Sequence, residues 1–131
     1  MRGIKMGRIN IISDATKNRT KFSVEGSITI IDVLNAIRKF YEGGAVTKNV
    51  LWDLTNGKAK EIQSSELENI VNLRKGFAHL RKGGKTAILA PADIEFGMSR
   101  MVELMTDFKE ETIETRVFRT MENTKQWLSE A

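Results

Sequence analysis

Apolar and polar residues alternate with two different periods along the chain, and these periods predict separate strands and helices. Thr20–Glu25 places Phe22 and Val24 on one face and polar side chains on the other, which predicts a half-buried strand. The preceding run, Gly7–Ser13, is apolar at alternate positions and is joined to it by a short polar turn. The two runs therefore predict an antiparallel hairpin.

The clearest helical pattern follows this hairpin. Apolar residues recur at intervals of three and four from Ile30 to Tyr41, as on one face of a buried helix. Thr29 has the side chain of an N-cap, Asp32 stands three residues later, and Gly43 begins a pair of glycines that ends the pattern. A helix over this segment is predicted, with one face in the core.

Three more pairs of a strand and a helix are predicted downstream. Strands that alternate with helices usually pair in parallel through right-handed crossovers, and the first hairpin adds an antiparallel edge. The predicted strands are Asn49–Leu54, Lys85–Ala90 and Glu114–Phe118, followed by helices capped by Ser65 (in a Ser-x-x-Glu capping box), Asp93 and Thr120. The fold class is therefore α/β, with a mixed, mostly parallel five-stranded sheet, four helices and the order ββαβαβαβα.

Length and hydropathy indicate one domain over residues 1–131, with residues 1–7 as a flexible N-terminal extension. A chain of 131 residues with 40% apolar residues can bury a core without further support. Its purely apolar runs are too short to span a membrane, and no apolar stretch follows the basic residues Arg2 and Lys5 as in a signal peptide. A cytoplasmic location is expected.

The side chains that most enzymes use are scarce. Cysteine is absent, which excludes disulfides, thiol nucleophiles and thiolate metal sites. Histidine occurs once, as His79, so sites with several histidine ligands are excluded and little remains for acid–base catalysis. We therefore expect a protein that is not an enzyme, with no catalytic residue, no metal site and no cofactor.

Basic residues are concentrated in two segments of a chain whose net charge is +4. Residues 74–92 contain five lysines and arginines and no acid, which could attract nucleic acid or an anionic membrane. Cations also suit the end of the predicted helix. Only Phe77 interrupts the basic residues with an aromatic ring, so nucleic acid is not an expected partner.

Residues 91–108 are the best candidate for a binding segment, since ligands of open α/β sheets meet the carboxyl ends of the strands. Three methionines there suit either the core or an adaptable, loosely filled pocket. Phe96 lies off the main apolar face, packed in the first turn or exposed as an anchor. Arg74 falls within the apolar arc of the preceding helix, as a snorkelling or ion-paired residue or as an anion contact. The candidate ligand-binding or partner-binding residues are Arg74, Phe96, Met98, Arg100, Met101 and Met105.

Several local strings resemble the SpoIIAA-like branch of the STAS superfamily, in particular small bacterial proteins that are mostly uncharacterised. The strings are Val50–Thr55, Gly83–Pro91, Phe96–Met101, and Val117–Arg119 with Trp127 and Leu128. The resemblance extends from about Arg8 to Leu128. It implies the family's mixed sheet with helices packed around it, and a non-catalytic regulatory or protein-interaction module.

The resemblance also implies a candidate phosphorylation site. Sporulation members of the superfamily are switched by phosphorylation of a serine at the start of the second helix, in the context Asp-Ser-Ser-Gly-Leu. The corresponding residues here are Gln63–Leu67, which makes Ser64 and Ser65 the candidate phosphoacceptors. The aspartate and the glycine are missing, and Glu66 would repel a phosphate on Ser65.

An alternative function follows from the members that the sequence resembles most. They have been linked with nonpolar ligands and with membranes, which implies a carrier or sensor of a lipid-like ligand at the inner face of the membrane. The expected partners are accordingly a protein or a second copy of the chain, with a nonpolar ligand or a membrane surface as alternatives.

Overall fold

A computed structural model describes residues 6–108 and 112–130 of the chain. Its centre is a five-stranded sheet with the strand order β1-β2-β3-β4-β5, in which β1 and β2 are antiparallel and the other neighbours are parallel. The strands are β1 (Arg8–Asp14), β2 (Arg19–Ser27), β3 (Asn49–Lys58), β4 (Lys85–Leu89) and β5 (Glu114–Phe118). The predicted mixed sheet and the order of elements are confirmed.

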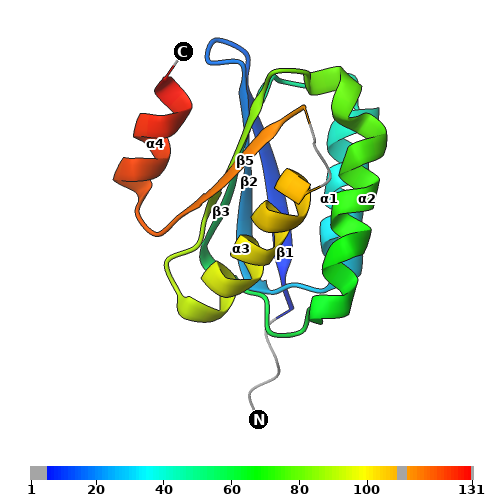
Figure 1. Cartoon of the computed structure of the whole chain (residues 1–131), viewed down its shortest axis with the longest axis vertical. Coiled ribbons are helices and arrows are strands. Elements are labelled where there is room, and N and C mark those ends of the chain that lie inside the picture. Colours follow the sequence, from blue (N-terminus) through cyan, green and yellow to red (C-terminus); the bar gives the residue numbers. More distant parts are fainter. Residues whose placement is uncertain (1–5, 109–111, 131) are drawn as a thin grey trace.

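Helices cover the two faces of the sheet unequally (Figure 1). They are α1 (Ile30–Glu42), α2 (Leu67–Phe77), α3 (Asp93–Phe108) and α4 (Met121–Ser129), with short 3₁₀ helices η1 (Ser64–Glu66) and η2 (Ala78–Arg81) at the two ends of α2. The main core lies between the sheet and α1, α2 and α3. A smaller core on the other face packs Trp127 and Leu128 of α4 against Leu51 and β4.

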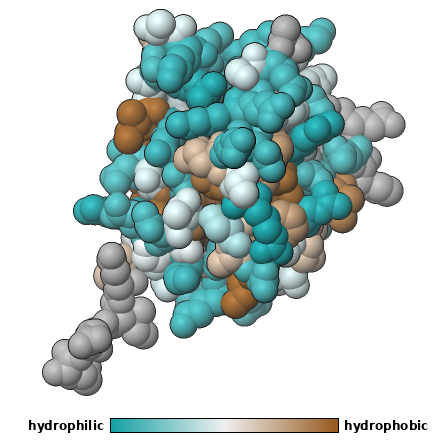
Figure 2. All heavy atoms as spheres, turned by 90° about the vertical axis from the view of Figure 1, so that its left-hand side faces the viewer, coloured by the Kyte–Doolittle hydropathy of each residue, from teal (hydrophilic) through white to brown (hydrophobic). Residues whose placement is uncertain are grey.

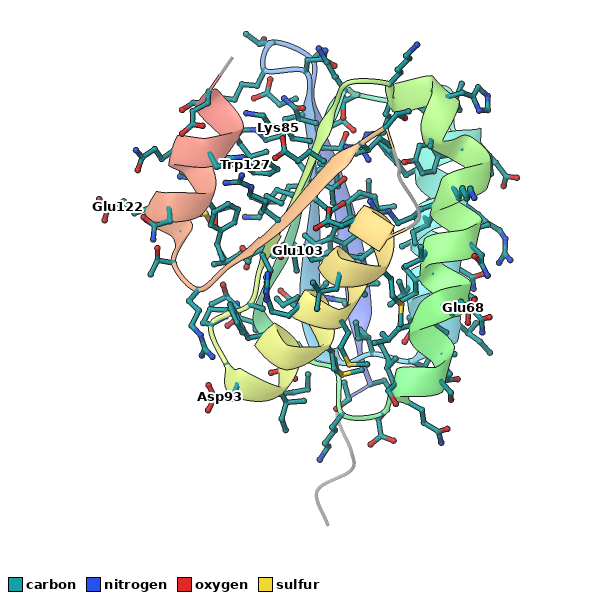
Figure 3. All side chains as sticks on the ribbon, viewed as in Figure 1. Glu68, Lys85, Asp93, Glu103, Glu122 and Trp127 are labelled. Carbon is teal, nitrogen blue, oxygen red and sulfur yellow. The ribbon has the colours of Figure 1, made fainter. Side chains whose placement is uncertain are left out.

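The face that carries α4 is mainly hydrophilic, with a few apolar side chains at its centre (Figure 2). Lys85 holds α4 in place there, since its Nζ donates to the carbonyl oxygens of Trp127 and Glu130 at 2.8 Å. Figure 3 shows Lys85 and Trp127 next to each other between α4 and the sheet.

Two of the predicted helix caps are confirmed. The hydroxyl of Thr29 accepts from the amide of Asp32, and the Asp32 carboxylate accepts from the amide of Thr29, which completes a capping box. At α4, the Thr120 hydroxyl accepts from the amide of Asn123. Both caps use the side chain that the sequence pattern selects.

The other two predicted caps are wrong. Ser65 lies inside η1 and does not cap α2, because the Glu66 carboxylate already bonds the amide of Gln63 at 2.8 Å and starts a 3₁₀ turn before the α-helix. Asp93 is the first residue of α3, and its carboxylate accepts from Arg119 at 2.7 Å. At α3, a residue distant in sequence thus binds the carboxylate that is expected to cap the helix.

The N-terminal end is partly described. Residues 1–5 of the predicted extension over residues 1–7 lie outside the described residues, and Met6 forms an isolated parallel bridge with Ser27. None of the described helices is long and apolar enough to cross a membrane.

Candidate functional site

A cavity of about 90 Å³ lies between the sheet and the three helices that share one face. Residues of β3 and β4 line it from the sheet, and residues of α1, α2, α3 and the segment before η1 line it from the other sides. It is partly open to solvent, and the half-buried side chains of Leu54 and Met98 belong to its lining. The apolar lining includes Ile28, Ile37, Leu54, Ile62, Ile70 and Val102.

Four polar side chains interrupt this apolar wall. Arg74, Thr86, Glu95 and Ser99 all line the cavity and are all buried. The Arg74 Nη2 donates to Thr115 Oγ1 at 2.9 Å, and Glu95 Oε2 accepts from the amide of Ala59 at 2.8 Å. The wall thus combines a cationic and an anionic side chain with two hydroxyl groups.

Thr86 differs from its neighbours in the wall. Its side chain is 1% exposed, and Oγ1 has no hydrogen-bond partner among the described residues. Buried hydroxyl groups are normally satisfied, so this atom requires an explanation. A second hollow of about 10 Å³ adjoins the cavity at this point, since Ile37, Trp52, Arg74 and Thr86 line both.

The structure brings two of the six candidate binding residues to the cavity. Arg74 and Met98 line it, and Met105 packs against the main core. Arg100 and Met101 are exposed on the outer side of α3, where Arg100 pairs with Glu103. The candidates therefore do not form one site, and a role in binding stays a prediction for each of them.

Phe96 is packed in the first turn of α3. Its ring is half-buried, and the guanidinium carbon of Arg119 lies 4.1 Å from the ring centroid. This arrangement settles the choice that the sequence left open between a packed ring and an exposed anchor. The binding role proposed for Phe96 would require Arg119 to move.

The helix α3 buries a different face from the one that the spacing of its apolar residues predicts, which includes Ile94 and Leu104. Its buried positions include Glu95, Ser99 and Thr106, whereas Ile94 and Leu104 are 57% and 55% exposed. The two carboxylates explain this difference, because Glu95 bonds the amide of Ala59 and Glu103 Oε2 accepts from the amide of Val117 at 2.7 Å. Figure 3 shows Glu103 between α3 and β5. Both carboxylates thereby satisfy backbone donors of segments distant in the sequence.

Three of the four polar residues of the cavity wall, Thr86, Glu95 and Ser99, are not among the candidates that the sequence indicates. A signal existed for Thr86, which is a hydroxyl-bearing residue in the buried strand β4. Glu95 and Ser99 are four residues apart and share a helix face with Val102, but their polarity argued for the solvent side. The spacing of Glu95 and Ser99 with Val102 places them on one helix face correctly, but the assumption that the buried face of α3 is purely apolar is wrong.

The other polar candidates lie away from the cavity wall. Ser64 and Ser65 are exposed in η1, and their phosphorylation stays a prediction. His79 is exposed on η2. Within the described ranges, no group of three or more histidines or carboxylates is placed to hold a metal ion.

Arg81 is a buried arginine next to the smaller hollow. It is 3% exposed, and its guanidinium donates to the carbonyl oxygens of Lys48 and Lys85 and to the hydroxyl of Tyr41, at distances of 3.0, 2.7 and 3.2 Å. Arg81 therefore does not snorkel to solvent, and it ties η2 to α1 and to the start of β4.

Asp53 lies in the middle of β3, on the sheet face opposite the cavity. Burial would raise the pKa of its carboxyl, but the hydroxyl and amide of Thr55 donate to Oδ1 and Lys21 lies 3.5 Å from Oδ2. These contacts outweigh burial and hold the pKa below its ordinary value. The carboxylate is thus a structural partner of Lys21 and Thr55.

Comparison with known proteins supports the fold. No family model and no curated protein matches the chain by sequence. Among solved structures, it is similar to an uncharacterized protein of the DUF3478 family from Shewanella loihica PV-4, which has a SpoIIAA-like fold. The two share 15% sequence identity over 98% of each chain, with a TM-score of 0.61. The SpoIIAA-like fold that the sequence predicted is therefore shown.

Proposed function

We propose that the protein is a non-catalytic binding module whose cavity takes a small, mostly apolar ligand. The observation that supports this most directly is the cavity itself, which lies under three helices and is lined chiefly by aliphatic side chains. Binding sites for small molecules are typically apolar hollows with a few polar groups at fixed positions. The four polar side chains of the wall fit that description.

The size of the cavity restricts the ligand. An engineered cavity of about 150 Å³ in another protein holds benzene, which has six non-hydrogen atoms, so by the same ratio a cavity of about 90 Å³ holds roughly four. A longer chain would have to extend through the opening of the cavity to solvent. A lipid is therefore expected to insert one end only, which is compatible with sensing at a membrane surface.

The experiment is native mass spectrometry of the protein purified from cells, followed by analysis of its organic extract. The cavity-filling variant Ser99→Leu serves as the test, because Ser99 is buried in the cavity wall. The variant Met101→Leu on the outer side of α3 is the matched control. A bound molecule that is lost in Ser99→Leu and kept in Met101→Leu supports the proposal.

The result that would overturn the proposal is equally specific. The proposal is wrong if the purified protein carries no bound molecule and also fails to bind small organic molecules that are added to it. Circular dichroism must show that Ser99→Leu is folded before its loss of ligand counts. Sedimentation with anionic and neutral vesicles then tests whether the protein associates with a membrane surface.

A second candidate function is self-association through the outer side of α3. Ile94, Met101 and Leu104 are exposed there, and Gly97 lies among them with open space beside its Cα. If the α3 helices of two copies pack antiparallel about a twofold axis at the level of residue 99, Ile94 of one copy faces Leu104 of the other. In the same arrangement, Gly97 of one copy faces Met101 of the other. The pattern is thus self-complementary, with a small residue opposite a large one.

Light scattering at increasing protein concentration tests this second candidate. Leu104→Glu should abolish a dimer, because it places charges in the contact on both copies. Leu80→Glu is the control, since Leu80 is 48% exposed but lies on η2, outside the contact. A monomer at all concentrations, or a dimer that survives Leu104→Glu, would rule out this interface.

A further inference from the structure

We infer that the cavity selects neutral ligands carrying one polar oxygen on a short hydrocarbon body, and that Thr86 binds this oxygen. The inference rests on the proposed function, because it specifies the chemistry of the ligand in the same cavity. It starts from Thr86 Oγ1, which is buried in the cavity wall and has no hydrogen-bond partner among the described residues.

The position of Thr86 explains why its hydroxyl is available to a ligand. Thr86 pairs in register with Val50 of β3 and with Thr115 of β5. The Thr115 hydroxyl accepts from Arg74 at 2.9 Å. Of these two neighbouring threonines, Thr115 therefore has a hydrogen-bond partner for its hydroxyl within the described residues, and Thr86 has none. Oγ1 of Thr86 can both donate and accept one hydrogen bond at the cavity wall.

Packing alone does not account for a threonine at this position. Valine has the same shape and is an equally good strand former, and it would avoid the cost of burying an unpartnered hydroxyl. A ligand oxygen would satisfy the hydroxyl while the hydrocarbon body lies against Ile37, Ile70 and Val102. The apolar wall and the unpartnered hydroxyl of Thr86 thus point to the same kind of ligand.

The charges of the wall favour a neutral ligand. Arg74 and Glu95 carry opposite charges and are both buried, so the wall favours neither sign of ligand charge on balance, and an ion would lose its hydration in this largely apolar cavity. A hydroxyl or carbonyl group avoids most of this cost. Short alcohols and ketones therefore form the expected class.

The experiment compares 1-butanol with 1-butanethiol by NMR titration of the full chain. These probes are similar in shape and differ mainly in the larger sulfur atom. The thiol is a much weaker hydrogen-bond partner, and the protein has no cysteine with which it could exchange. We expect the preference for the alcohol over the thiol to fall about fivefold to tenfold in Thr86→Val. Thr86→Ser, which restores the hydroxyl, should recover the preference.

The outcomes separate this inference from the proposed function. If neither probe perturbs the cavity residues of the wild-type protein, the proposed function fails. If both bind and Thr86→Val leaves their ratio unchanged, the cavity binds ligands but the role of Thr86 is wrong.

A measurement on the wild-type protein keeps the inference testable if Thr86→Val does not fold. Nuclear Overhauser effects should connect the Thr86 methyl group with the CH₂ next to the butanol oxygen. Contacts to the terminal methyl of butanol in place of that CH₂ would overturn the inference.

Discussion

The guanidinium of Arg119 covers the ring of Phe96 at 4.1 Å, and the same guanidinium donates to the carbonyl of Pro91 and to the carboxylate of Asp93. The contact joins the end of β5 to the first turn of α3. It explains why a phenylalanine off the main apolar face of α3 is not an exposed anchor.

This contact predicts a measurable coupling between Phe96 and Arg119. A double-mutant cycle with Phe96→Leu and Arg119→Met should give a coupling free energy of about 0.5–1 kcal/mol, as expected for a partly exposed cation–π contact. Urea unfolding of the four proteins provides the measurement. Additive effects of the two substitutions would show that the guanidinium of Arg119 and the ring of Phe96 lie close together without a stabilising interaction.

The overall fold could be predicted because each local pattern agreed with its neighbours. The period of two in Thr20–Glu25 and the cap at Thr29 both have local causes, and the structure places a strand and a helix start there. The orientation of α3 could not be predicted in this way. Glu95 and Glu103 are buried because they accept from Ala59 and Val117, which are distant in sequence.

The cavity escaped prediction for the same reason. A hollow arises where packed elements fail to fill the space between them, and sequence periodicity describes each element separately. Thr86, Glu95 and Ser99 line one cavity only because α3 buries its polar positions and β4 lies between β3 and β5 in the sheet. Of the predicted binding residues, only Arg74 and Met98 line it.

Arg81 is predicted to be a structural residue. Arg81→Met should lower the free energy of unfolding by about 3 kcal/mol or more, because three oxygen atoms in buried or partly buried contacts lose a charged donor at once. Arg81→Lys should recover only part of the loss, since one ammonium cannot reproduce the planar arrangement of donors. Urea unfolding measures both effects. Lys82→Met, at the exposed neighbouring position, is the control and should change stability by less than about 0.5 kcal/mol.

The contacts of Asp53 predict a dependence of stability on pH. Because the pKa of Asp53 is lowered in the folded protein, ionisation of its carboxyl stabilises the fold above the unfolded-state value of about 3.9. That contribution is lost as the pH falls through the folded-state pKa. Asp53→Asn should therefore lower stability at pH 7 by about 1 kcal/mol. The difference from wild type should shrink towards pH 3.

Urea midpoints of wild type and Asp53→Asn at pH 7 and pH 3 provide the measurement. The wild-type protein contains many other carboxylates, so the informative quantity is the difference between the two proteins at each pH. A difference that stays constant from pH 7 to pH 3 would mean that Lys21 and Thr55 do not favour the ionised carboxyl.

Two buried threonines of β strands should respond in opposite ways to replacement by valine. Thr86→Val should raise the free energy of unfolding of the ligand-free protein by about 1 kcal/mol, because it removes an unpartnered hydroxyl. Thr20→Val should lower it by about 1–2 kcal/mol, because the Thr20 hydroxyl bonds those of Ser13 and Thr47. Thermal unfolding in the absence of ligand distinguishes the two. Destabilisation by Thr86→Val would indicate that its hydroxyl is already satisfied.

Two glycines in helices, Gly97 on the outer side of α3 and Gly76 in α2, serve as a test position and its matched control. Gly76 in α2 and Gly97 in α3 both have nothing within 4 Å of the place where a Cβ would stand. Replacing either by alanine should therefore stabilise the monomer by about 0.5–1 kcal/mol, since glycine is a poor helix former. Urea unfolding at low protein concentration tests this. A loss of stability in either variant would show that the backbone there needs the freedom of glycine.

The same pair separates the monomer from the dimer. If two copies pack through α3, the added methyl of Gly97→Ala stands opposite Met101 of the other copy and should weaken association. Gly76→Ala adds the same methyl group to α2, outside this contact, and should leave association unchanged. Analytical ultracentrifugation over a range of concentrations compares the two variants. Equal dissociation constants for Gly76→Ala and Gly97→Ala would place any dimer contact elsewhere on the surface.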